Sequence, residues 1–372
     1  MISEKQTVDF EERLQKEFDK VKKNIKKPNI LLVGGTGVGK SSIINMIFGA
    51  DTATVGHSQP ETRGIKKIDQ NKAVVLYDTE GFEIGEKAEE AFHKNVLGFI
   101  ERKKKEVTEN QIHLVWFVIS GSSDRVTDYD IKLHNELKKL GIPVAIIFSK
   151  CDNADENSLE NMIVRLFPTT NYKKAFESNF NPFFTTTDEQ AVEDEPNLSI
   201  KKVVDWSLEK LPEQLKEAFI SAQQLNLEAK FDSARSIVLQ HTAGNALVGG
   251  SPIPFSDAPL LIMSQAGMIG RIVNLYGIEK VGISDFMQST GTSLIIGNLG
   301  KSLAGNLLKF IPGIGTIVGG IINATVASAI TYAMGTATNM ILHKILLNQL
   351  AGEKDTVTEI LENFGPQVQR II

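Results

Sequence analysis

The chain has 372 residues, which exceeds one typical domain and favours two or three. Its 40 Lys and Arg residues stand against 45 Asp and Glu residues, so the composition excludes a strongly basic nucleic-acid-binding protein. A single cysteine excludes an intramolecular disulfide and is typical of a reducing compartment. The first residues lack the apolar stretch of a secretory signal, so we expect a cytoplasmic protein.

The chain begins with the pattern of an amphipathic helix. Apolar residues recur there every three or four positions, at Phe10, Leu14, Phe18, Val21 and Ile25. Such a stripe needs an apolar partner. We expect the N-terminal helix, within residues 1–27, to pack on the helical domain of the same chain, in preference to a membrane or a partner protein.

Residues 28–199 alternate between apolar runs and helical patterns. This order predicts an α/β fold, with a mostly parallel six-stranded sheet covered by helices. The expected strands are 29–34, 64–69, 73–78, 112–119, 143–149 and 182–186. The expected helices are 40–49, 87–105, 127–140 and 156–167, and the acidic segment 187–199 is expected to be a surface loop.

A glycine-rich loop lies between the first expected strand and the first expected helix. Its sequence, GGTGVGKSS, has the P-loop spacing Gly-x-x-x-x-Gly-Lys-Ser. The glycines let backbone N–H groups turn inward toward phosphates, Lys40 neutralises the β- and γ-phosphates, and the Ser41 hydroxyl ligates Mg²⁺. The residues expected to bind the nucleotide here are Gly34, Gly35, Thr36, Gly37, Val38, Gly39, Lys40, Ser41 and Ser42.

Two later motifs stand at the ends of apolar strands. Asp78 and Gly81, in DTEG, have the spacing at which a carboxylate holds Mg²⁺ through water and a glycine N–H meets the γ-phosphate. The sequence SKCD follows the strand that ends near residue 149. There, the Asp152 carboxylate can accept the N1–H and 2-amino donors of guanine, while Lys150 lies along the ring and the P-loop. These motifs favour GTP over ATP.

In GGTGVGKS, DTEG and SKCD, residues 28–190 resemble the Era, TrmE and septin-like class of translation-factor-related GTPases. The resemblance implies a Ras-like P-loop GTPase domain over 28–199 that binds GTP or GDP with Mg²⁺. It also implies a switch threonine, for which we choose Thr62 over Thr52 and Thr54. It makes Ser41, Thr62 and Asp78 the metal residues, Lys40, Thr62 and Gly81 the catalytic ones, and Ser149, Lys150, Asp152 and Thr186 the guanine-side residues.

Hydrolysis of GTP is expected to be slow. Phe82 occupies the position where Ras-like enzymes carry the glutamine that orients the attacking water. The substitution resembles GTPases that fire when two G domains meet, so a homodimer is expected. Gly37 replaces the asparagine that holds potassium in some of them, which disfavours that mechanism. Candidate helpers, each more simply an ordinary surface residue, are Glu80, His57, Arg63 and Arg125.

Residues 200–372 read as an all-helical domain. Only 10 of the 40 basic and 11 of the 45 acidic residues lie in 212–372, which indicates helices that hide from water and argues against RNA binding. The region resembles the C-terminal helical domain of unknown function found in bacterial Era-like GTPases, and the overall plan resembles immunity-related and dynamin-like GTPases. The matching residues are Pro252, Ile253, Pro254, Asp257, Gln265, Tyr276, Gly277, Ile311 and Pro312.

Residues 310–342 contain no charged side chain. Pairs of small residues four apart, such as Thr331 and Gly335, allow close helix packing in lipid or in a tight soluble bundle. Lysines on both flanks make a single membrane span the least favoured reading. A soluble bundle, or peripheral or hairpin association with the cytoplasmic face of a membrane, therefore remains open, and so do membrane remodelling and recruitment of a protein partner as outputs.

Overall fold

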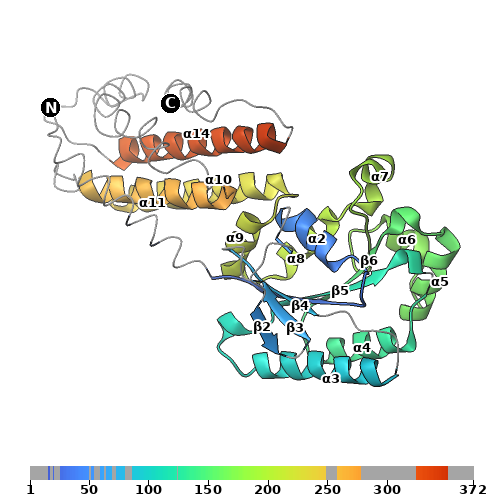
Figure 1. The fold of residues 1–372 in the computed structure, drawn as a ribbon. Helices are drawn as coiled ribbons and strands as arrows, with labels where there is room; N and C mark the ends of the chain where they lie inside the picture. Colours follow the sequence, from blue (N-terminus) through green and yellow to red (C-terminus); the bar gives the residue numbers. More distant parts are fainter. Residues whose placement is uncertain are drawn as a thin grey trace, which may run out of the picture. The chain divides into compact units, whose positions relative to one another are not determined.

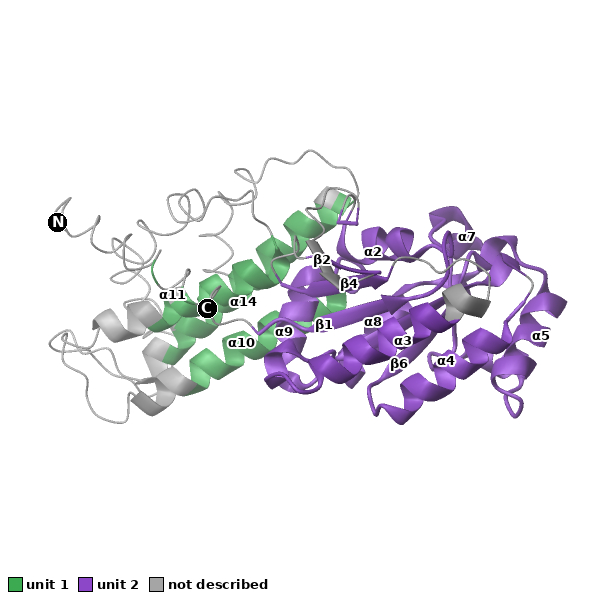
Figure 2. Cartoon of the chain, turned by 60° about the horizontal axis from the view of Figure 1, so that its bottom comes forward, with its two compact units in different colours: residues 1–25, 227–372 green, residues 26–226 purple. Residues whose placement is uncertain are grey.

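The computed structural model describes most of the first 248 residues and two later helices. The described residues are 16, 20, 26–49, 52–53, 59–62, 64–68, 73–79, 86–123, 125–248, 258–277 and 324–350. They divide into two compact units (Figure 2). The first along the chain is Lys26–Asn226, labelled unit 2 and drawn in purple, and the second contains the described helices from Leu227 onward, labelled unit 1 and drawn in green. The amphipathic helix expected near the N-terminus lies outside the described residues, apart from Lys16 and Lys20.

The first unit is built on a seven-stranded sheet with helices on both faces (Figure 1). The strand order is β2-β3-β4-β1-β5-β6-β7, and β3 runs antiparallel to both of its neighbours while the other pairs are parallel. The strands are β1 Asn29–Val33, β2 Gln59–Thr62, β3 Ile65–Ile68, β4 Val75–Thr79, β5 Leu114–Ser120, β6 Val144–Ser149 and β7 Phe183–Phe184. The mostly parallel α/β fold expected from the sequence is confirmed.

All six expected strands are present, and β2 is an addition to them. The polar sequence of β2, QPET, carries no apolar alternation, so it gave no strand signal. The four expected helices are also present, as α2 Lys40–Phe48, α3 Glu86–Lys103, α4 Asp128–Lys139 and α5 Glu156–Leu166. Two short helices, α6 Tyr172–Glu177 and α7 Glu189–Asp194, were not expected. Between the main elements lie the 3-10 turns η1 Thr108–Asn110, η2 Gly121–Ser123, η3 Cys151–Asn153 and η4 Pro196–Leu198.

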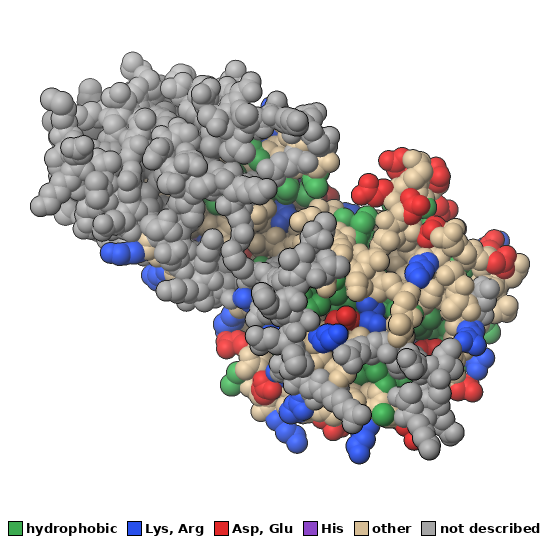
Figure 3. Space-filling view, in the orientation of Figure 1, with side chains coloured by type: hydrophobic (Ala, Val, Ile, Leu, Met, Phe, Trp, Pro, Cys, Tyr) green, Lys and Arg blue, Asp and Glu red, His purple; other side chains and the backbone are tan. Residues whose placement is uncertain are grey.

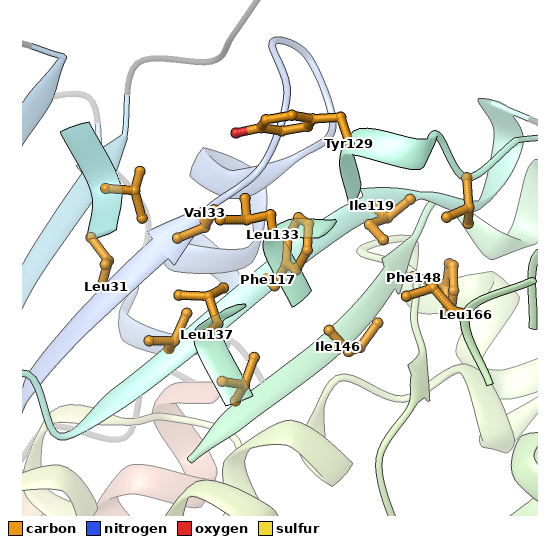
Figure 4. Packing of buried hydrophobic residues seen from close by; sticks show 14 of the residues in the cluster. Leu31, Val33, Phe117, Ile119, Tyr129, Leu133, Leu137, Ile146, Phe148 and Leu166 are labelled. Atoms are coloured by element: carbon orange, nitrogen blue, oxygen red, sulfur yellow. The ribbon is translucent and has the colours of Figure 1, made fainter. Parts of the chain in front are cut away.

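Both faces of the sheet are buried because successive apolar residues of its central strands point to opposite faces. In β1, Leu31 and Val33 face a core that α3, α4 and α5 cover, whereas Ile30 and Leu32 face the core on the other side. Figure 4 shows the first of these cores, in which Leu133 and Leu137 of α4 pack over Phe117 and Ile146. A continuous apolar run is expected of a strand covered on both faces.

The second face of the sheet is covered by α2 together with α8 Lys201–Lys210 and α9 Glu213–Ala222. From α8, Val203, Val204 and Trp206 enter this core, and Phe219 of α9 meets Phe48 edge to face. The sequence placed the domain boundary after residue 199. In the structure the compact unit extends to Asn226, because these two helices bury their apolar sides on the sheet.

The acidic segment 187–199 is exposed and partly helical. Figure 3 shows acidic side chains gathered over α7, where Asp188, Glu189, Glu193 and Asp194 are exposed. The Asp188 side chain accepts hydrogen bonds from the backbone N–H groups of Gln190 and Ala191 and so caps α7. The N-cap at Asp188 therefore favours the start of a helix here. The sequence of α7 has no apolar stripe, so its pattern did not predict the helix.

The described part of the second unit consists of α10 Leu227–Val248, α11 Ala258–Tyr276 and α14 Ala324–Leu350, which pack against one another. Several buried polar side chains form hydrogen bonds from one of these helices to another. The Tyr276 hydroxyl donates to Asn339 Oδ1 at 2.6 Å, and the Asn339 amide donates to the Phe231 carbonyl. The Gln265 amide donates to the Thr331 hydroxyl at 3.1 Å. These bonds fix the helices in register.

None of the helices in the described ranges is long and apolar enough to cross a membrane. Of the uncharged stretch 310–342, residues 324–342 belong to α14, and 310–323 lie outside the described residues. Gly335, one of the small residues of this stretch, allows α10 and α11 to approach α14 closely. A Cβ atom there would come within 2.6 Å of Val238 Cγ2 and 2.8 Å of Met268 Sδ.

Candidate functional site

The P-loop connects buried β1 to α2. Gly34 lies so close to β5 that a Cβ atom would come 2.3 Å from the Val118 carbonyl oxygen, which excludes any larger residue. Gly37 and Gly39 have φ values of 73° and 97°, in the left-handed region that favours glycine. The sequence therefore needs glycine at these three positions to form the turn.

The loop ends at the N-terminus of α2. No acidic residue lies in the first turn of this helix, so the partial positive charge of its N–H groups is available to an anion. Thr36, Gly37, Ser41 and Ser42 are exposed around this end of the helix. The arrangement is suited to a phosphate group.

Lys40 is buried beneath the loop. Its ammonium group donates to the carbonyl oxygens of Gly34 at 2.9 Å and Gly35 at 3.0 Å. Burial lowers the pKa of Lys40, and the negative charge of Asp78 partly opposes that shift. Two backbone carbonyls compensate poorly for a desolvated charge, so the site holds a cation that an anionic ligand would stabilise.

The loop after β6 is tied to the P-loop by two side chains. The Ser149 hydroxyl donates to the Val38 carbonyl, and the Lys150 ammonium group donates to the Gly37 carbonyl at 2.7 Å. Lys150 has a φ of 56°, a left-handed conformation that costs about 1 kcal/mol outside glycine. The bonds join the two parts of the site, and the expected contact of Lys150 with the P-loop is present.

Asp152 lies exposed in η3, where Asn153 Nδ2 donates to one of its carboxylate oxygens. Asn153 had not been singled out from the sequence, since an asparagine next to an acid gives no signal of its own. The neighbouring Cys151 is buried, and burial raises the pKa of its thiol to about 12, so it is unreactive. Its backbone N–H donates to the Thr185 carbonyl at 3.1 Å.

This last bond joins the two loops expected to face guanine. Thr186, expected from the sequence to face guanine through its backbone, uses its N–H group to donate to the Leu198 carbonyl. Its buried hydroxyl accepts a hydrogen bond from the N–H of Asp188. In the structure, Thr186 therefore anchors the loop that precedes α7.

Of the three residues expected to hold the metal, Ser41 and Asp78 are described with their side chains and Thr62 only by its backbone. Asp78 is half-buried near the carboxyl end of β4, and Ser41 is exposed at the start of α2. The Thr62 backbone pairs with Ile65 at the edge of the sheet, while its side chain lies outside the described part. Gly81 lies outside the described residues. The hydroxyl and carboxylate oxygens of Ser41 and Asp78 fit the preference of Mg²⁺ for oxygen ligands.

Of the four residues named as candidate helpers in hydrolysis, only Arg125 lies among the described residues. Arg125 is exposed in the segment between β5 and α4. Phe82, together with Glu80, His57 and Arg63, lies outside the described residues. Among the residues that the structure places, no group of three or more His, Cys, Asp or Glu side chains is arranged to hold a metal ion by itself.

Comparison with known proteins supports this arrangement. Residues 29–150 match the family described as 50S ribosome-binding GTPase. The chain is 27% identical over 135 residues to the probable GTP-binding protein EngB of Aquifex aeolicus, which covers 36% of this chain and 70% of EngB. It is 29% identical over 131 residues to GTPase Era of Actinobacillus pleuropneumoniae, which covers 34% of this chain and 40% of Era.

Two further comparisons gave a short sequence match and a weak structural match. GTPase Der of Xanthomonas campestris pv. campestris is 27% identical over 143 residues, covering 37% of this chain and 29% of Der. Among solved structures, a GDP-bound mutant of S. thermophilus NFeoB aligns with 92% of this chain and 98% of that chain, at 13% identity and a TM-score of 0.28. That score is too low to relate the folds of the whole chains. Over residues 29–150 the chain is therefore similar to the 50S ribosome-binding GTPase family.

Proposed function

We propose that the chain binds GTP and hydrolyses it slowly with Mg²⁺, acting as a nucleotide switch. The observation that carries the proposal is the link between the two loops of the site. Ser149 and Lys150, which precede the base-reading Asp152, donate to the carbonyls of Val38 and Gly37 in the loop that holds phosphate. A nucleoside triphosphate is a ligand that spans both loops.

Mg²⁺ would be held by Ser41, Thr62 and Asp78, the last through water. The ion would neutralise charge on the β- and γ-phosphates as the bond to the γ-phosphate breaks. Lys40 would contribute a second positive charge from the side of the loop, and the N–H of Gly81 would contact the γ-phosphate. Because Phe82 offers no hydrogen bond to a water molecule, we expect slow turnover in dilute protein.

Competition binding tests the choice of base. A fluorescent GTP analogue should be displaced by GTP and GDP but not by ATP. In Asp152→Asn, one acceptor becomes a donor, so GTP affinity should fall about 100-fold, which corresponds to about 2.7 kcal/mol. Xanthosine triphosphate, whose ring has a carbonyl in place of the 2-amino group, should gain affinity. Equal binding of GTP and ATP by the unmodified chain would refute the assignment.

Phosphate release measured over a range of protein concentrations tests hydrolysis. A specific rate that rises with concentration is expected if two G domains complete the site across a homodimer. A rate that is already fast in dilute monomer contradicts the role given to Phe82. Complete absence of release at every concentration would favour the alternative of a GTP-binding module that does not hydrolyse.

The output of the switch is proposed to be a change in what the helical domain, 200–372, contacts. One version places a cytoplasmic protein at a membrane surface, with the N-terminal helix of residues 1–27 packed on the helical domain. The other is an adaptor that recruits a protein partner. Liposome flotation with GTP, GDP and no nucleotide separates them, because only the membrane version predicts that a nucleotide state floats.

A further inference from the structure

The exposed carboxylate of Asp152 stands on a turn whose backbone is fixed. Cys151, the residue before it, is 6% exposed, and its N–H donates to the Thr185 carbonyl at 3.1 Å. Within η3, the Asn153 N–H donates to the Lys150 carbonyl at 3.3 Å, which closes the turn. The place of the Asp152 backbone is therefore set by its neighbours, and the rotations that remain are those of its side chain.

One neighbouring side chain restrains these rotations. The amide nitrogen of Asn153, Nδ2, donates a hydrogen bond to one of the two carboxylate oxygens of Asp152. An ionised carboxylate can only accept hydrogen bonds, so the nitrogen of the amide and not its oxygen faces it. Among the residues that the structure describes, no other forms a hydrogen bond to this carboxylate. The bond from Asn153 therefore selects the direction in which the Asp152 carboxylate points.

We propose that Asn153 is a positioning residue that sets the preference of the site for guanine by holding the plane of the Asp152 carboxylate. The inference rests on the proposed function, in which Asp152 accepts the N1–H and 2-amino donors of guanine. These two donors point the same way in one plane, so both are accepted only when both carboxylate oxygens lie in that plane. Rotation about the last side-chain bond of aspartate is soft, because that bond joins an sp³ carbon to an sp² carbon.

The bond from Asn153 leaves both oxygens of Asp152 able to accept from the base. Each carboxylate oxygen has two lone-pair sites, so the oxygen that accepts from Asn153 keeps one of them for guanine. Asn153 therefore does not compete with the base. Its contribution is preorganisation, because fixing one rotatable side chain before the ligand arrives raises affinity by about 2- to 10-fold.

The base of the ligand decides how much this restraint contributes. Guanine offers two donors, whereas hypoxanthine, the base of inosine triphosphate, lacks the 2-amino group and offers only N1–H. A single hydrogen bond tolerates many orientations of the carboxylate, but a pair of parallel bonds requires one. The restraint by Asn153 therefore favours GTP over inosine triphosphate. General support of the loop would instead raise the affinity for both ligands equally.

Binding of GTP and inosine triphosphate to variants of the full chain tests the proposal. In Asn153→Ala we expect the affinity for GTP to fall about 5-fold and that for inosine triphosphate to change by less than about 2-fold. Asn153→Asp keeps the shape of the side chain, but its carboxylate cannot donate and repels Asp152, so it lowers the preference for GTP at least as far. The matched control is Asn135→Ala, which removes an exposed asparagine of α4 and leaves both affinities unchanged.

A double-mutant cycle tests whether Asn153 acts through Asp152. In the Asp152→Asn background, Asn153→Ala should no longer change the ratio of the two affinities, because the carboxylate that it holds is gone. A change of the ratio that persists in this background overturns the inference. So does an Asn153→Ala variant that loses both ligands equally, or neither, and these results leave GTP binding by the unmodified chain intact.

Failure of the proposed function gives a different result. An unmodified chain that binds GTP no more tightly than inosine triphosphate would refute the reading of guanine by Asp152, and the inference about Asn153 would fall with it. Circular dichroism of each variant checks that the fold is kept. Asn153 is exposed, so neither of its substitutions opens a cavity in the core.

Discussion

Lys230 is a buried ammonium group in the helical unit, 2% exposed, on α10. It donates to the carbonyl of Leu275 at 3.0 Å, close to the C-terminal end of α11, where the helix dipole favours a positive charge. Burial nevertheless lowers the pKa of Lys230 to about 7. The carbonyl and the dipole thus do not fully replace the water that the charge has lost.

The lowered pKa gives a stability that depends on pH. Between about 7 and 10.5 the unfolded chain binds a proton at Lys230 that the folded chain does not, so the free energy of unfolding rises with pH. From pH 7 to pH 9 we expect a rise of about 2 kcal/mol from this group. Urea unfolding followed by circular dichroism should show the rise in the unmodified chain and lose it in Lys230→Met.

The exposed Lys344 provides the control for this measurement, since Lys344→Met removes a lysine of the same unit without removing a buried charge. Its pH profile should match that of the unmodified chain. A Lys230→Met profile as steep as the unmodified one would show that another group carries the dependence.

At the scale of single residues, the sequence predicted the glycine-rich turn after β1 but not the hydrogen bonds that tie this turn to the loop after β6. The spacing of Gly34, Gly39 and Lys40 encodes a loop whose geometry is local, so the pattern alone was sufficient. The partner of Ser149 comes from a chain segment whose approach depends on the assembled sheet. The contact of Ser149 with Val38 spans 111 residues, and no local pattern encodes it.

At the scale of helices, two glycines allow the effect of helix propensity on stability to be separated from the effect of packing. Gly335 of α14 faces Val238 and Met268, both buried, with no room for a Cβ atom. Gly267 of α11 has only His241, at 4.0 Å, near the place of its Cβ. Alanine gains about 1 kcal/mol in a helix interior over glycine. Substitution by alanine therefore gives the same gain in helix propensity at both positions. Only at Gly335 does the added methyl group overpack the core, which costs about 1–3 kcal/mol.

We accordingly expect Gly335→Ala to lower the free energy of unfolding and Gly267→Ala to raise it by up to about 1 kcal/mol. Thermal and urea unfolding of the two variants beside the unmodified chain measure both signs. If Gly335→Ala proves as stabilising as Gly267→Ala, the helices do not approach as closely as the structure places them.

Elements were predictable where one periodicity dominated a whole stretch. The strands β1, β5 and β6 are apolar runs and the helices α4 and α5 have apolar stripes, so their ends were expected within two residues. The short β2 and α7 were missed because pairing with β3 and capping by Asp188 form them, without an apolar pattern. Pairing and capping of this kind depend on neighbours more than on composition.

The whole molecule divides at a place that the sequence did not indicate. The acidic segment before Ile200 has the composition of a linker, yet α8 and α9 beyond it belong to the core of the unit Lys26–Asn226. Trp116 of the central strand β5 donates from its indole to the buried Ser207 hydroxyl at 3.1 Å. The end of α9 is also fastened, since the Gln224 N–H donates to the Ile47 carbonyl of α2 at 2.8 Å.

Truncation separates the two boundaries. A fragment of residues 26–226 keeps both faces of the sheet covered, so it should fold cooperatively and bind guanine nucleotide about as tightly as the full chain. A fragment of residues 26–199 would expose Trp116, Val118 and their neighbours to water and should aggregate or unfold. Circular dichroism, thermal unfolding and nucleotide titration compare them. Equal folding of the two fragments would mean that α8 and α9 only rest on the sheet, whereas loss of binding in both would place part of the nucleotide site beyond Asn226.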